Sequence, residues 1–328
     1  MFQAQRFFDR DLSGLEGCLR DWLADHPAMG VLVYLPEAQA GSVGRVQACC
    51  RALSVPLVGA VFPALITPDG FVTEGAWVMR FDTMPLHGLV DGLSADASVS
   101  ARRLVSEMGE VLASAAEPGA IAYMVFDAML PHIGSLMTDV AKVFAERLHT
   151  VGVNAGSETF QPMPCLFDGE RCVGNAALCL SLPTPKGLAV EHGYPVSNTL
   201  MRASSTQGNR IDAIDGRPAL AVYQDIIQRE YGVTLTRENF YSYAVHYPFG
   251  VITALKVLVR IPVGLTDDGA ILCVGEVPPN SALRLLRAPE TPDQSTCAAS
   301  LSAMLDGAAQ DASLHTFYCA GRRMHFGA

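Results

Sequence analysis

Polar side chains that could contact a small ligand gather in one stretch of the chain, from Gly187 to Tyr223. This stretch contains a His-Gly pair, then a run of hydroxyl and amide side chains, and then Asp-Gly-Arg-Pro-Ala starting at Asp215. The neighbouring segments have the composition of a protein core. Because buried polar side chains need partners, this density predicts either a series of turns or a ligand site.

His192 is the first residue of this stretch with chemistry of its own. It follows the apolar run Leu188–Val190, which we expect to be a strand, and it precedes Gly193. Its imidazole would then lie at a strand end, where a neutral ring can bind a haem iron or hydrogen-bond an anionic ligand. The alternative is a turn histidine that bonds to the backbone.

Arg217 lies in the block Asp-Gly-Arg-Pro. This block most simply marks the start of a helix, with a capping residue followed by proline in the first turn. In the functional alternative, Arg217 donates two hydrogen bonds to a ligand carboxylate or a haem propionate. Arg202 and Asn209, from the preceding polar run, could then assist.

A catalytic alternative would pair Cys165 with His192 and use Asp215 to orient the imidazole. However, Cys165 lies in the apolar sequence Pro-Cys-Leu-Phe, where burial should raise the pKa of the thiol and keep it inert. The chain contains neither a Gly-x-Ser-x-Gly nor a His-Glu-x-x-His motif. We therefore expect a protein that is not an enzyme.

The bulk composition excludes several classes of partner. Half of the residues are hydrophobic, only 17% are charged and the net charge is −10, which argues against nucleic acid and anionic membranes. No apolar run approaches the ~20 residues that span a bilayer, and the N-terminus has no signal-peptide core. Nine cysteines without a Cys-x-x-Cys pair fit reduced, buried thiols. We expect a cytoplasmic protein.

An internal repeat organises the first half of the chain. Residues 30–82 contain the pattern of a strand, a helix, a second strand and then two strands joined by a glycine-containing turn. The same order returns over residues 120–183. Val58-Gly59-Ala60 in the first copy corresponds to Val151-Gly152-Val153 in the second. Each copy is therefore β-α-β-ββ, and neither can cover its own sheet.

Two such copies packed face to face, with their helices outside, predict a layered α/β (α+β) fold. The proline-rich segment Leu182–Gly187 is the best candidate linker to a mixed α/β second half. In that half we expect helices and strands over the following ranges: helices at Pro218–Tyr231 and Ser295–Ala308, and strands at Tyr241–Val245, Ile252–Arg260, Ala270–Val277 and Leu314–Cys319.

Several motifs resemble those of the FIST sensory proteins, which are bacterial signal-transduction modules. The order His-Gly-Tyr, then Asn, then Ile-Asp-Gly-Arg-Pro-Ala-Leu is similar to the junction between the two FIST halves. Pro-Cys-Leu-Phe, His-Tyr-Pro-Phe-Gly, Cys-Val-Gly-Glu-Val-Pro and Phe-Tyr-Cys-Ala-Gly-Arg match further family segments. The resemblance implies a FIST N-like domain over residues 1–210 and a FIST C-like domain over residues 211–328.

The resemblance also implies a function, namely a small-ligand sensor that modulates a partner such as a histidine kinase. The sequence resembles the haem-binding, nitric-oxide-sensing branch in its Pro-Cys-Leu-Phe and His-Gly segments. This resemblance implies an axial histidine ligand, for which His192 is the first choice and His246 the second choice. An amino-acid-like ligand without haem is the alternative, and the implied site comprises His192, Tyr194, Arg202, Asn209, Arg217 and His246.

The sequence also departs from the family pattern. Tyr194 stands where a tryptophan is usual, and Ile261 stands where an acidic residue is usual. The chain ends at Ala328, where family members usually continue with a further strand pair. We therefore expect a shortened member or a truncated chain.

Overall fold

A computed structural model describes residues 2–145, 147–254, 256–288, 299, 302–303 and 314–326. The chain forms two compact units. The first comprises residues 1–130, 135–185 and 313–315, and the second comprises residues 131–134, 186–312 and 316–328. The change of unit after Pro185 lies in the proline-rich segment. Our division of the chain at residue 210 stays a prediction.

The first unit is an internal duplication. Its first copy consists of β1 (Ala4–Phe8), α1 (Leu15–Asp25), β2 (Gly30–Pro36), the 3-10 turn η1 (Glu37–Ser42), α2 (Val43–Ala52), β3 (Leu57–Phe62), β4 (Leu65–Thr67), β5 (Gly70–Val72) and β6 (Ala76–Phe81). Its second copy consists of β7 (His87–Val90), α3 (Ala97–Ala115), β8 (Ala120–Asp127), α4 (Ile133–Val143), β9 (Thr150–Ala155), β10 (Leu166–Asp168), β11 (Cys172–Val173) and β12 (Ala177–Pro183).

Strand pairing confirms the predicted repeat and extends it. One sheet has the order β1-β6-β2-β3 and the other β7-β12-β8-β9, so equivalent strands hold equivalent places. In each sheet the last pair in this order, β2–β3 or β8–β9, is parallel and the other two pairs are antiparallel. Each copy therefore begins with a strand and a helix that the sequence pattern did not reveal. The hairpin β10–β11 of the second copy pairs with β3 of the first.

The repeated glycine has the same physical cause in both copies. Gly59 lies opposite Val33 in the first parallel pair, and Gly152 lies opposite Met124 in the second. A Cβ at Gly59 would collide with the carbonyl oxygen of Val33, and one at Gly152 would collide with that of Met124. Only glycine permits this close approach of neighbouring backbones.

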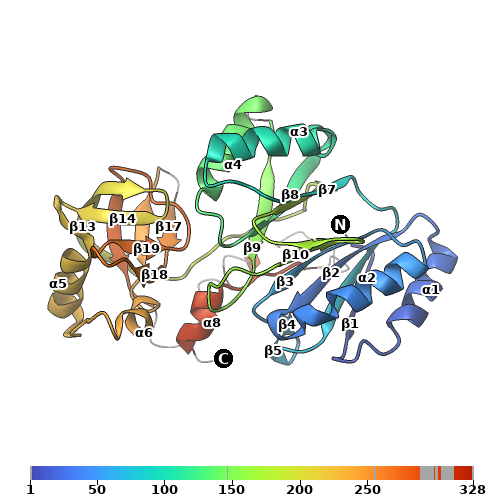
Figure 1. Cartoon of the computed structure of the whole chain (residues 1–328), viewed down its shortest axis with the longest axis horizontal. Coiled ribbons are helices and arrows are strands. Elements are labelled where there is room, and N and C mark those ends of the chain that lie inside the picture. Colours follow the sequence, from blue (N-terminus) through green and yellow to red (C-terminus); the bar gives the residue numbers. More distant parts are fainter. Residues whose placement is uncertain are drawn as a thin grey trace. The chain divides into compact units, whose positions relative to one another are not determined.

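The two sheets share one core, and the helices cover their outer faces (Figure 1). The core cluster combines β2 residues such as Val33 and Tyr34 with β8 residues such as Tyr123 and Val125. The helices α1 and α2 lie on the first sheet, and α3 packs on β7, β8 and β12 of the second (Figure 1). This is the layered α/β arrangement that the sequence predicts.

The second unit is a mixed α/β unit built on one antiparallel sheet. Its elements are β13 (Val196–Gln207), β14 (Arg210–Ile214), β15 (Arg217–Pro218), α5 (Ala219–Tyr231), α6 (Phe240–Ala244), β16 (Phe249–Ile252), β17 (Val257–Arg260), β18 (Pro262–Leu265), β19 (Ile271–Cys273), β20 (Ala282–Leu286) and α8 (Ala320–Phe326). The sheet order is β17-β16-β20-β13-β14-β19-β18, and β15 pairs with β14. Tyr223 and Ile227 of α5 join its core.

Three predicted strands are wrong. Residues 241–245 belong largely to α6, because Phe240 and Ala244 have helical spacing and are both buried. Residues 188–190 are irregular and expose Leu188 and Val190, and none of the described strands pairs with them. Residues 314–319 also have no regular secondary structure. The helix predicted over residues 295–308 lies outside the described residues, apart from 299 and 302–303.

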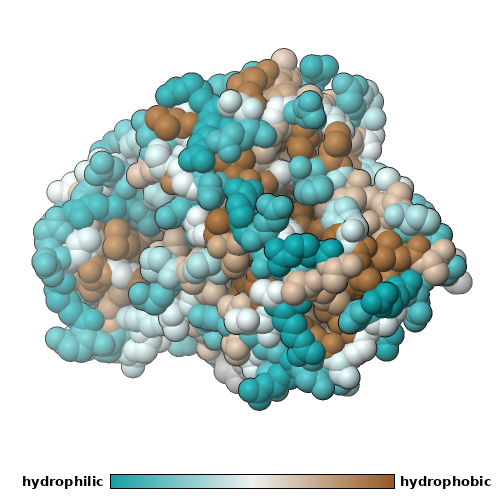
Figure 2. Space-filling model, turned by 45° about the vertical axis from the view of Figure 1, so that its right-hand side comes forward, coloured by the Kyte–Doolittle hydropathy of each residue, from teal (hydrophilic) through white to brown (hydrophobic). Residues whose placement is uncertain are grey.

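The surface mixes polar and apolar side chains. Figure 2 shows hydrophilic residues over much of the visible face, with apolar patches between them. Within the part of the chain that the structure describes, no helix is long and apolar enough to cross a membrane.

Candidate functional site

His192 and Tyr194 meet in a tight turn before β13. Gly193 has a φ of 61°, in the left-handed region that favours glycine, and this turns the chain back on itself. The backbone N–H of Tyr194 then donates to Nδ1 of His192 at 2.9 Å. His192 is thus a turn histidine bonded to the backbone. Burial lowers the pKa of this imidazole, so the ring is neutral at pH 7.

Arg322 of α8 packs against this turn. Its guanidinium lies 5.5 Å from the centre of the Tyr194 ring and 5.8 Å from that of Tyr318. One of its N–H groups donates to the carbonyl oxygen of His192. Only 5% of Arg322 is exposed, so a cation is held in a largely desolvated place between two aromatic rings.

The hydroxyl group of Tyr194 is the unusual part of this cluster. Only 4% of Tyr194 is exposed, and its ring packs with Leu286 and Ala288. Its oxygen is buried and has no hydrogen-bond partner among the described residues. Burial raises the pKa of this phenol, so the group stays protonated and remains a hydrogen-bond donor.

His246 pairs with His325, which lies in α8 like Arg322. Nδ1 of His246 and Nδ1 of His325 share a hydrogen bond, and the ring centres lie 4.6 Å apart. Burial and the neighbouring His325 lower the pKa of His246. The segment after β20 lies beside both the Tyr194 turn and His246. The backbone N–H of Arg287 donates to the carbonyl of Pro195, and that of Ala288 donates to the carbonyl of His246.

The other predicted residues make ordinary structural contacts. The backbone N–H of Arg202 donates to Asp215, and the Asn209 amide donates to the carbonyl of Cys273 at 3.0 Å. Arg217 forms an exposed ion pair with Asp225 at 2.6 Å. The structure therefore places His192 and Tyr194 in one turn against Arg322, while Arg202, Asn209 and Arg217 contact other partners.

Arg322 and His325 were not among the residues predicted for the site. Arg322 does lie in the Phe-Tyr-Cys-Ala-Gly-Arg segment that carries the family resemblance, and this was the one available signal. Its burial depends on α8 packing at the turn, with Gly321 so close to Ile261 that a side chain would clash. Sequence spacing does not reveal such a contact.

The thiol of Cys165 lies in the first unit, whereas His192 belongs to the second. Cys165 is fully buried, and this burial raises the pKa of its thiol far above the ordinary value. A thiol in this state is a poor nucleophile at neutral pH, because only the thiolate attacks. Asp215, the third residue of the catalytic alternative, accepts a hydrogen bond from the backbone N–H of Arg202.

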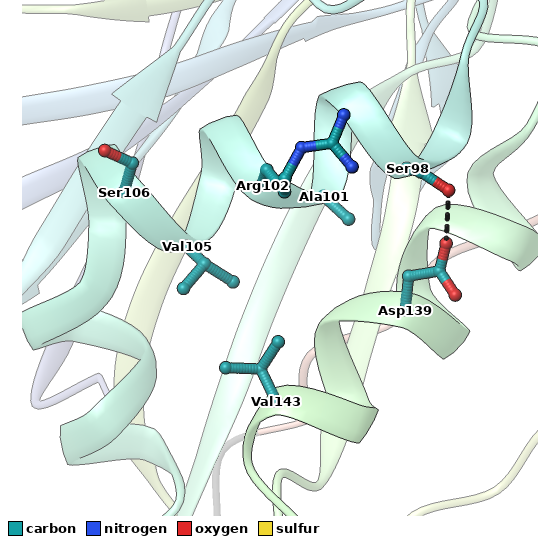
Figure 3. A pocket seen from close by; sticks show the side chains of 7 residues that line it. All are labelled: Ser98, Ala101, Arg102, Val105, Ser106, Asp139 and Val143. Atoms are coloured by element: carbon teal, nitrogen blue, oxygen red, sulfur yellow. Dashed lines mark hydrogen bonds between the residues drawn. The ribbon is translucent and has the colours of Figure 1, made fainter.

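An open pocket of about 450 Å³ lies between α3 and α4 of the first unit (Figure 3). Ala101, Val105 and Val143 form its apolar part, and Ser98 donates to Asp139 at 3.2 Å at one end. None of the predicted site residues lines it. Because Asp139 also pairs with Lys142, its carboxylate is already compensated.

A haem can be tested against these histidines by asking which ring nitrogen has a free lone pair. Nδ1 of His192 accepts a hydrogen bond, so the neutral ring carries its proton on Nε2 and offers no lone pair there. His192 in this turn does not fit an axial ligand. In the His246–His325 pair one Nδ1 donates to the other, which leaves a lone pair on one Nε2. His246 fits better. Among the residues that the structure describes, no three His, Cys, Asp or Glu side chains form a metal cluster.

Comparison with known proteins identifies the family. The FIST N domain model matches residues 31–217, and the FIST C domain model matches residues 219–328. No curated protein matches the chain. The two family models extend into both units and include every predicted site residue. The chain belongs to the FIST family, whose domains are small-ligand sensors of signal-transduction proteins.

Proposed function

We propose that the second unit is a sensor for a small carboxylate ligand of the amino-acid type, bound at Tyr194 and Arg322. The observation that carries this proposal is the buried hydroxyl of Tyr194, which has no partner among the described residues and lies on a ring stacked against a buried guanidinium. A buried donor without a partner costs about 1–3 kcal/mol. A ligand carboxylate removes this cost by accepting from the hydroxyl.

Arg322 supplies the charge that favours an anion. A guanidinium binds carboxylates strongly, and the attraction is larger where water is excluded, as it is around this 5% exposed side chain. The neutral ring of His192 and its turn fix the backbone carbonyl that holds Arg322. His192 and Tyr194 thus remain in the site, with His192 positioning Arg322.

Titration of the wild-type protein with the common amino acids and small dicarboxylates, followed by calorimetry, tests this proposal. We expect one of them to bind, and we expect Tyr194→Phe and Arg322→Lys each to weaken its binding at least about tenfold. Arg217→Lys is the matched control, because Arg217 is exposed and pairs with Asp225. If no carboxylate binds, or if Tyr194→Phe binds as tightly as wild type, the proposal fails.

Haem with nitric oxide sensing is the second candidate, and the His246–His325 pair favours it. His325 would orient His246 in the way that a hydrogen-bonded partner orients a ligating histidine. A bound haem would supply an iron that coordinates nitric oxide. After haem reconstitution we expect His246→Ala, but not His192→Ala, to lose the Soret band. A band that depends on His192 instead would contradict this choice of ligand.

The proposal includes a downstream partner and excludes catalysis. A cytoplasmic histidine kinase would receive the signal, and adding the protein with its ligand should change autophosphorylation of that kinase.

A thiol enzyme would lose turnover when Cys165 is alkylated. We expect no alkylation of Cys165 in the folded protein, because the side chain is fully buried. Alkylation of the native protein at Cys165 would reopen the enzyme hypothesis.

A further inference from the structure

One histidine of the C-terminal segment is inserted into the first unit. Residues 313–315 are grouped with that unit, although residues 186–312 before them and residues 316–328 after them belong to the second. Its ring stacks on Tyr34 of β2 with ring centres 5.6 Å apart. Phe2 approaches it edge-on at 5.2 Å, and Tyr123 of β8 lies at 5.7 Å. Three aromatic side chains from distant parts of the unit thus surround one imidazole.

The surroundings of His315 are unusual for a core. The hydroxyls of Tyr34 and Tyr123 lie 2.5 Å apart and hydrogen-bond to each other across the two sheets. Both tyrosines are at least 95% buried. A sandwich core is normally filled by apolar side chains, and here a polar pocket is filled by a residue far away in the sequence.

Only the side chain of His315 is inserted, whereas its chain neighbours stay outside. Leu314 is 59% exposed and Phe317 is 38% exposed, and residues 314–319 form neither helix nor strand. Withdrawal of His315 would therefore break no sheet or helix. The segment also leads into α8, which begins at Ala320.

We propose that Phe2, Tyr34 and Tyr123 form an aromatic cage for a small planar heteroaromatic ligand, and that His315 fills this cage until such a ligand displaces it. The imidazole shows the size and chemistry that the cage accepts, namely a flat five-membered ring with polar nitrogens. Burial lowers the pKa of His315 to about 4, so the ring is neutral at pH 7. The ligand should likewise be neutral.

Imidazole itself is the first probe, with cyclopentanol as the non-aromatic ring of similar size. In His315→Ala the cage is open, and we expect saturable binding of imidazole but not of cyclopentanol. Wild type should bind imidazole at least about tenfold more weakly, because the internal ring must first leave the cage. His149→Ala removes an exposed histidine and is the matched control. It should bind like wild type.

His315→Phe provides a second variant that keeps the cage filled and preserves packing. It should fold and should not bind imidazole. Equal binding by wild type, His315→Ala and His315→Phe would overturn the proposal, as would a folded His315→Ala protein that binds no imidazole.

A measurement on wild type covers the case in which His315→Ala does not fold. The ring signals of His315 can be assigned in an NMR spectrum because they are absent from the spectrum of His315→Phe. As imidazole is added, these signals should move to the chemical shifts of a solvent-exposed histidine ring. Signals that stay at their buried positions at saturating imidazole would overturn the displacement.

Discussion

Two regions of the molecule bury tyrosine hydroxyl groups, and they satisfy these groups differently. In the first unit, Tyr34 and Tyr123 bond to each other and a histidine ring closes the pocket. In the second unit, Tyr194 is equally buried, yet its hydroxyl has no partner among the described residues. The space beside Tyr34 and Tyr123 is filled by the chain itself, whereas Tyr194 keeps a buried donor that a ligand can satisfy.

This difference shows how the two units would respond to a ligand. A ligand of the first unit must displace His315 and therefore loses affinity. A ligand of the second unit removes the cost of a buried donor and therefore gains affinity. Substitutions in either region test one side of this comparison, and the largest effect on stability is expected at His315.

Acid should destabilise the protein through His315. The pKa of this ring falls from 6.5 to about 4 on folding, because burial disfavours the charged form. The unfolded state therefore binds the proton more readily. The stabilisation from the neutral ring is complete above pH 6.5 and is lost as the pH falls toward 4, by about 3 kcal/mol in total.

Urea unfolding at pH 7.5 and 4.5 measures this loss, with His315→Phe as the reference that removes the titrating ring. Tyr34 and Tyr123 also face His315, but both stay neutral throughout this range because burial raises their pKa values. The difference in unfolding free energy between wild type and His315→Phe should shift against wild type at pH 4.5. A difference that does not depend on pH would contradict the burial of this histidine.

Tyr34→Phe should cost about 2 kcal/mol in the free energy of unfolding. The change removes one hydroxyl of a buried pair and leaves the Tyr123 hydroxyl without this bond. Denaturant unfolding of Tyr34→Phe, Tyr123→Phe and the double variant forms a complete cycle. The double variant should lose less than the sum of the single losses. Additive losses would mean that the two hydroxyls do not interact.

Tyr223→Phe should cost about 1 kcal/mol and serves as the internal control for the second unit. Tyr223 is fully buried, and its hydroxyl donates to the carbonyl of Tyr247 at 2.7 Å. Removing a satisfied hydroxyl loses a hydrogen bond. Thermal unfolding should show a lower midpoint than wild type, and an unchanged midpoint would show that buried hydroxyls contribute little here.

Arg217→Ala should change stability by less than about 0.5 kcal/mol, the smallest of these effects. The ion pair with Asp225 is more than half exposed on both sides, so solvent screens it. Carboxylate binding should also be unchanged, as calorimetry can show. Loss of binding in Arg217→Ala would return this residue to the ligand site.

The fold could largely be predicted from periodicity, and the reasons are visible in individual elements. β2, β3, β8 and β12 are short apolar runs between turn residues, and the two Val-Gly segments mark the duplication. The prediction failed where aromatic residues suggested a strand, at residues 241–245, because the burial of Phe240 and Ala244 decided in favour of a helix. The strands β1 and β7 were missed because each depends on pairing with a distant strand.

Less of the candidate site could be predicted from the sequence. His192 and Tyr194 lie together because a local Gly193 turn joins them, and local turns can be read from sequence. Arg322 is separated from them by most of the second unit, so its contact with Tyr194 depends on tertiary packing. The same holds for His325 beside His246. The roles of Arg202, Asn209 and Arg217 as ligand contacts stay predictions.

The variant Tyr194→Phe tests the central claim most directly, because it should move stability and binding in opposite directions. We predict that ligand-free Tyr194→Phe is more stable than wild type by about 1 kcal/mol, since it no longer buries a donor without a partner. We also predict that it binds the carboxylate ligand at least about tenfold more weakly. Lower stability of the ligand-free variant together with unchanged binding would contradict the claim that this hydroxyl is kept for a ligand.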